Sequence, residues 1–443
     1  MGNNNDSLPK NHKTLYYDEN SNIEFVNCEM KGWRDTMEDA SLFKLNFLDN
    51  KDWMLFGIFD GHGGNLISNF CAKNFQEILK NNILKYMHKL NKNYKTLQDS
   101  DIQHCLIESF LKLDELLKSP KINSILQEIE TEISNNPNSK LINDNIFDSK
   151  FKLIPISQFS KLKAVFDSDS CFLSSTNKSS QLNKSFKSLD INLNNFPKSN
   201  SCITCNNVED NLNKTNNENI SENISCKNNS DELLNEKSDN SFVNSNLTRI
   251  DSEYYLKNLK KSKGTISEMI KKKELVSKRM GTTANIVLMT NDKLYVANVG
   301  DSLAIMYKNK KAIRLNTEHK PNLKVEFDRI INSGETVVNN RVGGKLNMSR
   351  SIGDFIFKSN KKLKNYEQAV IAHPEVNIFD LSSEVDFIIL ACDGVWDCVE
   401  DQKFCLEIDR RLKQKKQEMH ELISDLFDLL IAKNKMSKLI III

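Results

Sequence analysis

The chain has 443 residues, of which 39% are hydrophobic, and its 61 Lys and Arg nearly balance 59 Asp and Glu, for a formal net charge of +2. This balance argues against a dedicated nucleic-acid or polyanion binder. No apolar stretch has the length of a membrane span, and the N-terminus lacks the apolar core of a signal peptide. We therefore expect a soluble, intracellular protein whose ten cysteines are reduced thiols.

The N-terminal part of the chain predicts a flexible start followed by strands and two helices. Residues 1–21 are polar, and we expect them to be flexible. Residues 23–59 have a strand-like pattern that ends in a continuous apolar run at 53–58. Apolar residues then recur at helical spacing, which predicts helices over 65–92 and 104–118.

The composition changes in the middle of the chain. We interpret residues 118–274 as a low-complexity insertion. Its centre, 165–250, is dominated by Asn, Ser, Lys and Asp, and it buries too little apolar surface to offset the entropy of ordering, so we expect it to be disordered. The flanks, 119–164 and 250–275, leave room for short helices.

Ordered structure is expected again from Met280 onwards. The pattern predicts paired strands and one strand with a continuous apolar run, at 285–290, 294–299, 304–307, 312–315 and 386–392. A helix is predicted at 323–333 and one long amphipathic helix at 402–433. Leu439 and the four isoleucines after it favour a last buried strand. Adjacent strands pair antiparallel and long helices need a sheet to cover, so we expect an α+β fold of two packed antiparallel sheets with helices outside.

Two buried strands are each followed directly by an Asp-Gly pair. Asp60 and Gly61 follow the first, and Asp393 and Gly394 follow the second. An isolated Asp-Gly more often marks a turn. Two buried strands that both end in a carboxylate suggest a shared site, and a bound cation is the simplest group that holds both charges together.

Eight motifs in order resemble the metal-dependent Ser/Thr protein phosphatases of the PPM, or 2C, type. They are GWRDTMED at 32–39, FDGHGG at 59–64, GTTA at 281–284, ANVGDS at 297–302, EHKP at 318–321, SRSIGD at 349–354, HPEV at 373–376 and CDGVWD at 392–397. The resemblance covers about 22–117 and 275–434. It implies an α-β-β-α sandwich of two antiparallel sheets flanked by helices, in a domain split into 22–117 and 275–443.

The resemblance also implies a site for two Mg²⁺ or Mn²⁺ ions, with a weaker third. Asp60 matches the carboxylate that bridges the two ions, and Gly61 matches a residue that offers its backbone carbonyl. Glu38 and Asp393 match ligands of the second ion. Asp301 matches a ligand of the third. Carboxylate and carbonyl oxygens are the donors that these cations prefer.

The implied activity is hydrolysis of phosphoserine and phosphothreonine in phosphorylated proteins. A hydroxide held between the two ions attacks phosphorus in line. Arg34 matches the residue that binds the phosphate oxygens, and His62 matches the general acid that protonates the leaving oxygen. Asp39 and Asp397 are expected to support the ligands from behind. No organic cofactor and no nucleic-acid partner are implied.

Two thiol interpretations are weaker. Cys405 and Arg411 have the Cys-x5-Arg spacing of tyrosine phosphatases, but no glycines lie between them to cradle a phosphate, and the segment has a helical pattern. Cys202 and Cys205 suggest zinc, but no second pair follows at a suitable spacing and only Cys226 is near. We therefore interpret Cys202 and Cys205 as an incidental pair and not as a zinc site.

The C-terminal end departs from the family pattern. Members have a loop carrying Asp-Asn, whose Asp is a second-metal ligand, before the last strand. In this chain Asn434 and Lys435 occupy the positions of that Asp-Asn pair. Glu318 and Leu303 are milder departures, at positions where Asp and Arg are usual. The alternative is therefore a catalytically impaired regulatory or phosphoprotein-binding protein, or a misassembled gene product.

Location and association follow from less specific signals. We expect a monomer in the cytoplasm, with the nucleus or the membrane periphery as alternatives. Membrane association would require myristoylation of Gly2, and Asp6 stands where that motif wants Ser or Thr, with Ser7 one place late.

Overall fold

The computed structural model describes residues 14–18, 23–32, 34, 36–135, 275–414, 417–431 and 438–442, which belong to one compact unit. Several sequence-based predictions therefore concern residues outside the described ones. These are the disordered insertion, Gly2, the Cys202–Cys205 pair, Asn434 and Lys435. Within the described residues, no helix is long and apolar enough to cross a membrane.

One antiparallel sheet has five strands. Its order is β14 (Glu375–Asp380), β8 (Lys293–Val299), β7 (Ala284–Met289), β4 (Met54–Phe59) and β3 (Ala40–Lys44). β4 and β7 are buried at every residue, and β8 at all but its first. The continuous apolar run of β4 therefore lies at a fully covered position.

A second antiparallel sheet has six strands. Its order is β1 (Thr14–Asp18), β2 (Phe25–Met30), β16 (Lys438–Ile442), β15 (Val385–Ala391), β9 (Leu303–Lys308) and β10 (Lys311–Arg314). The predicted last strand is confirmed as β16, which pairs between β2 and β15. Two minor sheets join β13 (Ile352–Gly353), β6 (Gly281–Thr282) and β5 (Gly61–His62), and β11 (Val337–Val338) with β12 (Arg341–Val342).

Alternate residues of β15 pack on opposite faces of its sheet. Phe387, Ile389 and Ala391 belong to the cluster that includes the helices α10 (Asp401–Gln414) and α11 (Met419–Ile431). Ile388 and Leu390 belong to the cluster between the two sheets. A strand buried on both faces requires this pattern.

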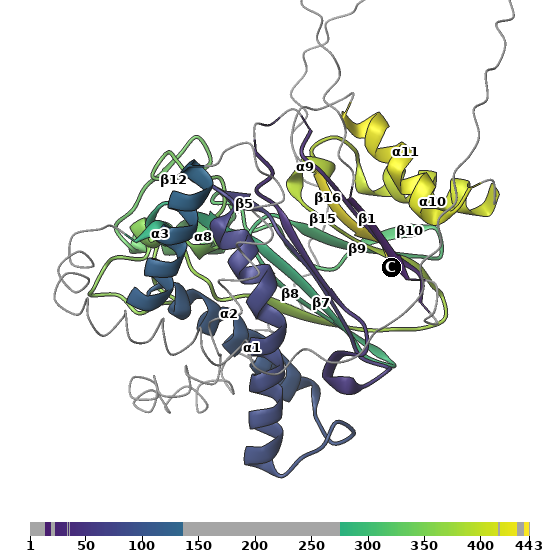
Figure 1. Ribbon diagram of the computed structural model, residues 1–443, viewed down its shortest axis with the longest axis horizontal. Helices are drawn as coiled ribbons and strands as arrows, with labels where there is room; N and C mark the ends of the chain where they lie inside the picture. Colours follow the sequence, from purple (N-terminus) through teal and green to yellow (C-terminus); the bar gives the residue numbers. More distant parts are fainter. Residues whose placement is uncertain are drawn as a thin grey trace, which may run out of the picture. The chain divides into compact units, whose positions relative to one another are not determined.

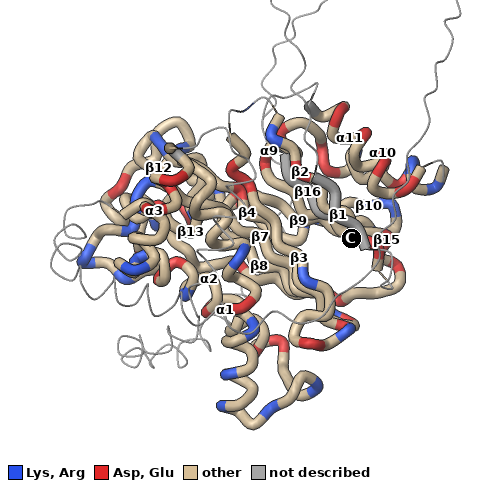
Figure 2. The backbone as a smooth tube through the Cα atoms, in the orientation of Figure 1, with Lys and Arg blue, Asp and Glu red and all other residues tan. Residues whose placement is uncertain are grey.

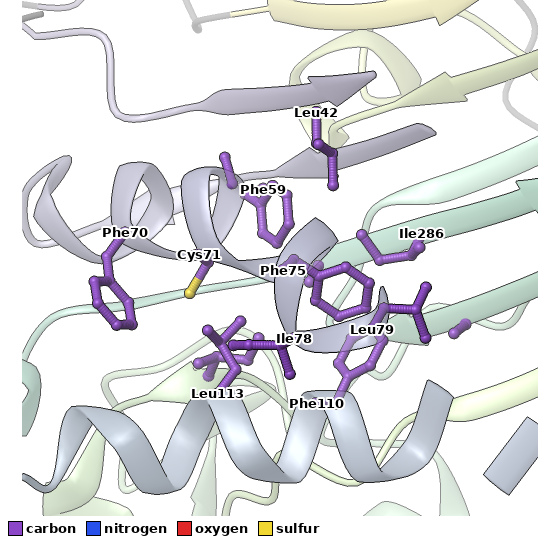
Figure 3. Close-up of a cluster of buried hydrophobic side chains, with 14 of the residues drawn as sticks. Leu42, Phe59, Phe70, Cys71, Phe75, Ile78, Leu79, Phe110, Leu113 and Ile286 are labelled. Atoms are coloured by element: carbon purple, nitrogen blue, oxygen red, sulfur yellow. The ribbon is translucent and has the colours of Figure 1, made fainter. Parts of the chain in front are cut away.

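The other sheet is covered by α1 (Leu66–Leu90), α2 (Asp99–Leu117) and α3 (Pro120–Asn135), on the side away from α10 and α11 (Figure 1). Phe59 of β4, Phe75 of α1 and Phe110 of α2 meet in this core, with Phe75 and Phe110 edge to face at 5.1 Å (Figure 3). The layers are therefore helix, sheet, sheet, helix, which confirms the predicted sandwich.

One predicted helix is wrong in its extent. The sequence predicts a single helix over 402–433, but α10 ends at Gln414 and α11 begins at Met419. Six consecutive polar residues, 413–418, separate Leu412 from Met419 and interrupt the apolar face. The helix ends there because, over that stretch, a continuous helix would have no apolar face to bury.

The remaining helices are short. α8 (Lys324–Asn332) matches the helix predicted at 323–333, and α9 (Asp393–Trp396) follows β15. Single 3₁₀ turns occupy Phe47–Asp49, Val276–Lys278 and Phe355–Phe357. α3 lies within the flank for which short helices were considered.

Candidate active site

Asp60 directly follows β4, and the threonines of the GTTA motif hold its backbone. The carbonyl oxygen of Asp60 accepts hydrogen bonds from Thr282 Oγ1 at 3.0 Å and from the Thr283 amide at 2.9 Å. The Asp60 amide in turn donates to Thr283 Oγ1 at 3.2 Å. These bonds bring together in the fold two motifs whose bonded residues, Asp60 and Thr283, are 223 positions apart in the chain.

Gly61 allows the segment that carries Glu38 to approach. A Cβ on Gly61 would overlap the backbone carbonyl oxygen of Glu38 and lie 2.8 Å from Ser68 Oγ. Ser68 also donates to that same carbonyl oxygen. The Glu38 side chain is half-buried, and its Oε1 accepts from Thr36 Oγ1 at 3.3 Å. Any larger residue at 61 would push Glu38 away from Asp60.

Asp39, Asp60 and Asp393 come together from three separate parts of the chain. Burial and the charges of Asp39, Asp393 and Asp301 raise the pKa of Asp60 well above its usual value. Burial and Asp393 raise the pKa of Asp39 to about 7. Burial, Asp301 and Asp397 raise the pKa of Asp393 to about 6. These carboxyl groups repel one another when no cation lies between them.

The donor set fits a hard divalent cation. The Oδ2 of Asp39 and the Oδ1 of Asp301 are buried without a hydrogen-bond partner, and the carboxyls of Asp60 and Asp393 lie close enough to share a hydrogen bond. Within the described residues, no three His, Cys, Asp or Glu side chains converge closely enough to hold a metal ion as they stand. The chemistry therefore suits Mg²⁺ or Mn²⁺, although the side chains do not form a closed ligand shell.

Arg34 and Asp397 lie at the exposed rim. Both side chains are exposed to solvent. The charge of Arg34 acts to lower the pKa of Asp39, and that of Asp397 acts to raise the pKa of Asp393. Figure 2 shows acidic segments beside β4 and α9, at the end of the sheets where these residues lie. An exposed cation beside a buried acidic group can reach a bound anion without being desolvated itself.

His62, on β5, pairs with Asp354. Its Nε2 lies 2.8 Å from Oδ2 and 2.9 Å from Oδ1 of that residue. Burial alone would lower the pKa of His62, but the carboxylate of Asp354 outweighs it and raises the pKa. Asp354 belongs to the SRSIGD motif, yet the sequence alone assigns it no role. Its position in that motif was the available signal, but the contact with His62 depends on the tertiary fold.

The tyrosine-phosphatase alternative is not supported by the geometry. Cys405 lies inside α10 and is buried against the six-stranded sheet, and burial raises the pKa of its thiol to about 12. Arg411 donates to Glu407 Oε1 at 2.6 Å, one turn earlier on the same helix. A buried thiol with a raised pKa is a poor nucleophile.

Comparison with known proteins gives the family. The sequence profile of Protein phosphatase 2C matches residues 23–134 and 212–439. The chain belongs to this family. It is 26% identical over 408 residues to a probable protein phosphatase 2C 58 of Oryza sativa subsp. japonica, covering 90% of this chain and 75% of that protein. It is 27% identical over 410 residues to a probable protein phosphatase 2C 21 of Arabidopsis thaliana, covering 92% and 81%.

A solved structure supports the fold. The crystal structure of a phosphatase from a pathogenic strain of Toxoplasma gondii aligns with a TM-score of 0.50 and 16% identity, covering 97% of this chain and 93% of that one. At this identity the likeness concerns the fold alone. Together with the family match, it confirms the α-β-β-α sandwich of a protein phosphatase, and the family is generally Mg²⁺- or Mn²⁺-dependent.

Proposed function

We propose that this chain hydrolyses phosphoserine and phosphothreonine in phosphorylated proteins and depends on Mg²⁺ or Mn²⁺. The observation that carries the proposal is the acidic cluster at the end of the sheets. Burial and neighbouring carboxylates raise the pKa of Asp39, Asp60 and Asp393 there, and two buried carboxylate oxygens, Oδ2 of Asp39 and Oδ1 of Asp301, have no partner among the described residues. Such a cluster is destabilising by itself and favourable around a divalent cation.

The residues that would hold the ions are Asp60, the carbonyl of Gly61, Glu38 and Asp393, with Asp301 toward a weaker third ion. Bound Mg²⁺ or Mn²⁺ would supply the positive charge that activates water and neutralises the phosphate. Asp39 is buried beside this set, where the charge of Asp393 acts to raise its pKa and a bound cation would relieve the repulsion. Thr282 and Thr283 keep the backbone of Asp60 in place before any ion binds.

Two further side chains act on the substrate. Arg34 offers a planar fork of donors at the exposed rim, which suits the oxygens of a phosphate monoester. His62 gives a proton to the leaving serine or threonine oxygen. A serine or threonine alkoxide is a poor leaving group, so protonation during P–O cleavage lowers the barrier.

Phosphate release from a phosphothreonine peptide at increasing Mn²⁺ tests the proposal. Asp60→Asn keeps the shape of the side chain but removes its charge, and should lower kcat/KM by at least roughly a hundredfold. Calorimetric titration should show weaker Mn²⁺ uptake by the same variant. Asp328→Asn, on the exposed surface of α8, is the matched control and should match wild type. Wild-type protein that releases no phosphate at millimolar Mn²⁺ or Mg²⁺ would contradict the proposal.

The second candidate is a protein of the same family that binds phosphoproteins without turnover. It is favoured by Asn434 and Lys435 at the positions of the family's Asp-Asn, because a neutral amide is a weaker ligand and a lysine opposes cation binding. It predicts that the phosphopeptide binds without phosphate release. Asn434→Asp combined with Lys435→Asn should then create Mn²⁺-dependent hydrolysis, whereas an already active enzyme would gain little.

A further inference from the structure

The His62–Asp354 contact joins residues that are 292 positions apart. The exposed fraction is 25% for the His62 side chain and 4% for that of Asp354. The imidazole presents one nitrogen, Nε2, to both carboxylate oxygens. A carboxylate only accepts hydrogen bonds, so Nε2 must carry a proton, and Nδ1 is the nitrogen left over. Nδ1 is buried and has no hydrogen-bond partner among the described residues.

Gly281 is what lets the two side chains meet. A Cβ at this position would overlap Oδ2 of Asp354 and lie 2.8 Å from Nε2 of His62. Gly281 pairs with His62 and with Gly353 in the small three-stranded sheet, so its backbone passes directly beside the contact. The glycine of the GTTA motif therefore has a specific task, because any side chain there would separate the histidine from the carboxylate.

Asp354 is held in its position by several bonds. Its carboxylate accepts from Ser351 Oγ at 2.6 Å, and its amide donates to the Met280 carbonyl at 3.1 Å. Its backbone has φ 52°, in the left-handed region that non-glycine residues rarely adopt. Aspartate adopts this region more readily than most non-glycine residues, so the hydrogen bonds, more than backbone strain, fix the position of the Asp354 carboxylate.

A buried ion pair anchors this turn to α2. Lys358 donates from Nζ to Asp114 Oδ1 at 2.7 Å and to the Ser351 carbonyl at 2.8 Å. Asp114 Oδ1 also accepts from the Gly353 amide at 2.9 Å. The exposed fractions of the Lys358 and Asp114 side chains are only 5% and 10%. The carboxylate that faces His62 is thus fixed from the helix layer, independently of the acidic cluster.

We propose that Asp354 is a positioning residue that fixes the ring orientation and the Nε2–H tautomer of His62, and so sets how this imidazole meets the leaving group. The proposal rests on the function proposed above. When the ester P–O bond breaks, its electron pair goes to the serine or threonine oxygen, which takes a proton from the imidazolium form of His62. The water oxygen forms the new bond to phosphorus, and its two protons stay on the released phosphate. Asp354 itself transfers no proton.

The first test compares two substrates of different leaving-group quality. p-Nitrophenolate leaves readily without a proton, whereas a threonine alkoxide does not, so only the second depends on an oriented general acid. Asp354→Asn should lower kcat/KM for a phosphothreonine peptide at least about tenfold more than for p-nitrophenyl phosphate. Gly281→Ala should produce the same discrimination. Asp101→Asn, a buried aspartate in α2 far along the chain from the site, should lower stability without discriminating between the substrates.

The second test reads the tautomer directly. The chain has seven histidines, and the His62 signals are assigned by their loss in His62→Gln. Long-range ¹H–¹⁵N spectra of neutral wild-type imidazole should show a protonated Nε2 and an unprotonated Nδ1. Asp354→Asn should give a mixture of tautomers or the reverse one, while thermal melting confirms that the variant folds.

The outcomes separate the two proposals. Equal losses on both substrates, with an unchanged His62 tautomer in Asp354→Asn, would overturn the positioning role while leaving the phosphatase function intact. Wild-type protein that hydrolyses neither substrate would overturn the proposed function and the catalytic part of this inference. The spectra would still decide whether Asp354 sets the tautomer.

Discussion

The Nζ of Lys320 lies 2.5 Å from Oδ2 of Asp301, whose side chain is 1% exposed. Burial alone would lower the pKa of Lys320, but the Asp301 carboxylate outweighs it and raises the pKa, with a smaller contribution from Asp393. The lysine is therefore a permanent cation at the edge of the acidic cluster. A metal ion at Asp301 would have to share this carboxylate with the ammonium group or displace it.

Replacing Lys320 with methionine should have opposite effects on the metal-free and metal-loaded protein. Without metal, Asp301 loses its ion-pair partner, and the free energy of unfolding should fall by about 2 kcal/mol. With metal, removal of a competing cation should tighten Mn²⁺ binding in calorimetric titration. Lys324→Met is the control, because that lysine is 87% exposed and its ion pair, with Asp328, lies on the surface of α8. Unchanged Mn²⁺ affinity in Lys320→Met would show that the ammonium and the metal do not compete.

The stability of the metal-free protein should depend on pH through Asp39 and Asp393. Their pKa values are raised to about 7 and about 6, above the ordinary 3.8. The folded state thus binds more protons than the unfolded state between pH 4 and 7, so this contribution to stability is present at pH 4 and is lost as pH rises to 7. In EDTA, Tm should fall over that range, by about 2–4 °C for each kcal/mol lost.

Mn²⁺ should reverse this dependence, since the cation stabilises the ionised carboxylates. Thermal melts at pH 4.5, 6 and 7.5, with EDTA or with Mn²⁺, are the measurement. Asp39→Asn combined with Asp393→Asn should reduce the slope of the EDTA profile, and the remaining slope is expected from Asp60, whose pKa burial also raises. If the double variant keeps the wild-type slope in EDTA, other groups are responsible for it.

Much of the fold could be predicted from the sequence, because its central strands are buried on both faces. The apolar runs at β4 and β15 have no periodicity, yet their length and their aromatic and β-branched content favour strands. The sequence did not predict the break between α10 and α11, because the apolar periodicity was taken over 402–433 as a whole. Six consecutive polar residues within that range were not given separate weight.

Less of the candidate site could be predicted from the sequence. Asp60 and Asp393 could be singled out because each follows a buried strand. Asp354 could not be assigned a role, because its contact with His62 exists only when β5, β6 and β13 form one small sheet around Gly281. A partner 292 positions away leaves no local pattern in the chain.

Glu326→Gln should destabilise the protein by roughly 3 kcal/mol. The side chain of Glu326 is 3% exposed and accepts from Arg329 at 2.6 Å, from Arg350 at 2.5 Å and from Ser349 at 2.6 Å. Burial alone would raise the pKa of Glu326, but Arg350 and Arg329 outweigh it and lower the pKa to about 2. This contribution to stability is present at neutral pH and is lost as pH falls toward 2, because the folded state binds fewer protons.

Urea unfolding of Glu326→Gln measures that cost, and Glu407→Gln on α10 is the comparison. Glu407 also pairs with two arginines, Arg410 and Arg411, but its side chain is 35% exposed. Its loss should cost below about 1 kcal/mol, as for surface pairs in general. Equal costs for the two variants would mean that burial does not set the strength of the Glu326 cluster.

The close packing of Gly57 against Ile286 provides a test of the core between β4 and β7. A Cβ added at Gly57 would lie 2.5 Å from Cδ1 of Ile286, with its other near neighbours, Phe59 and Leu42, at ordinary distances. Gly57→Ala should therefore cost about 1–3 kcal/mol through overpacking. Ile286→Val removes the clashing Cδ1 and alone should cost about 0.5–1.5 kcal/mol. The double variant should be more stable than the sum of the single losses by roughly 1 kcal/mol. Gly57→Ala combined with Ile305→Val, which lies in the cluster beneath α10 and α11, should be additive. Additivity in the Ile286 pair as well would show that the backbone of β4, and not Ile286, absorbs the added methyl group.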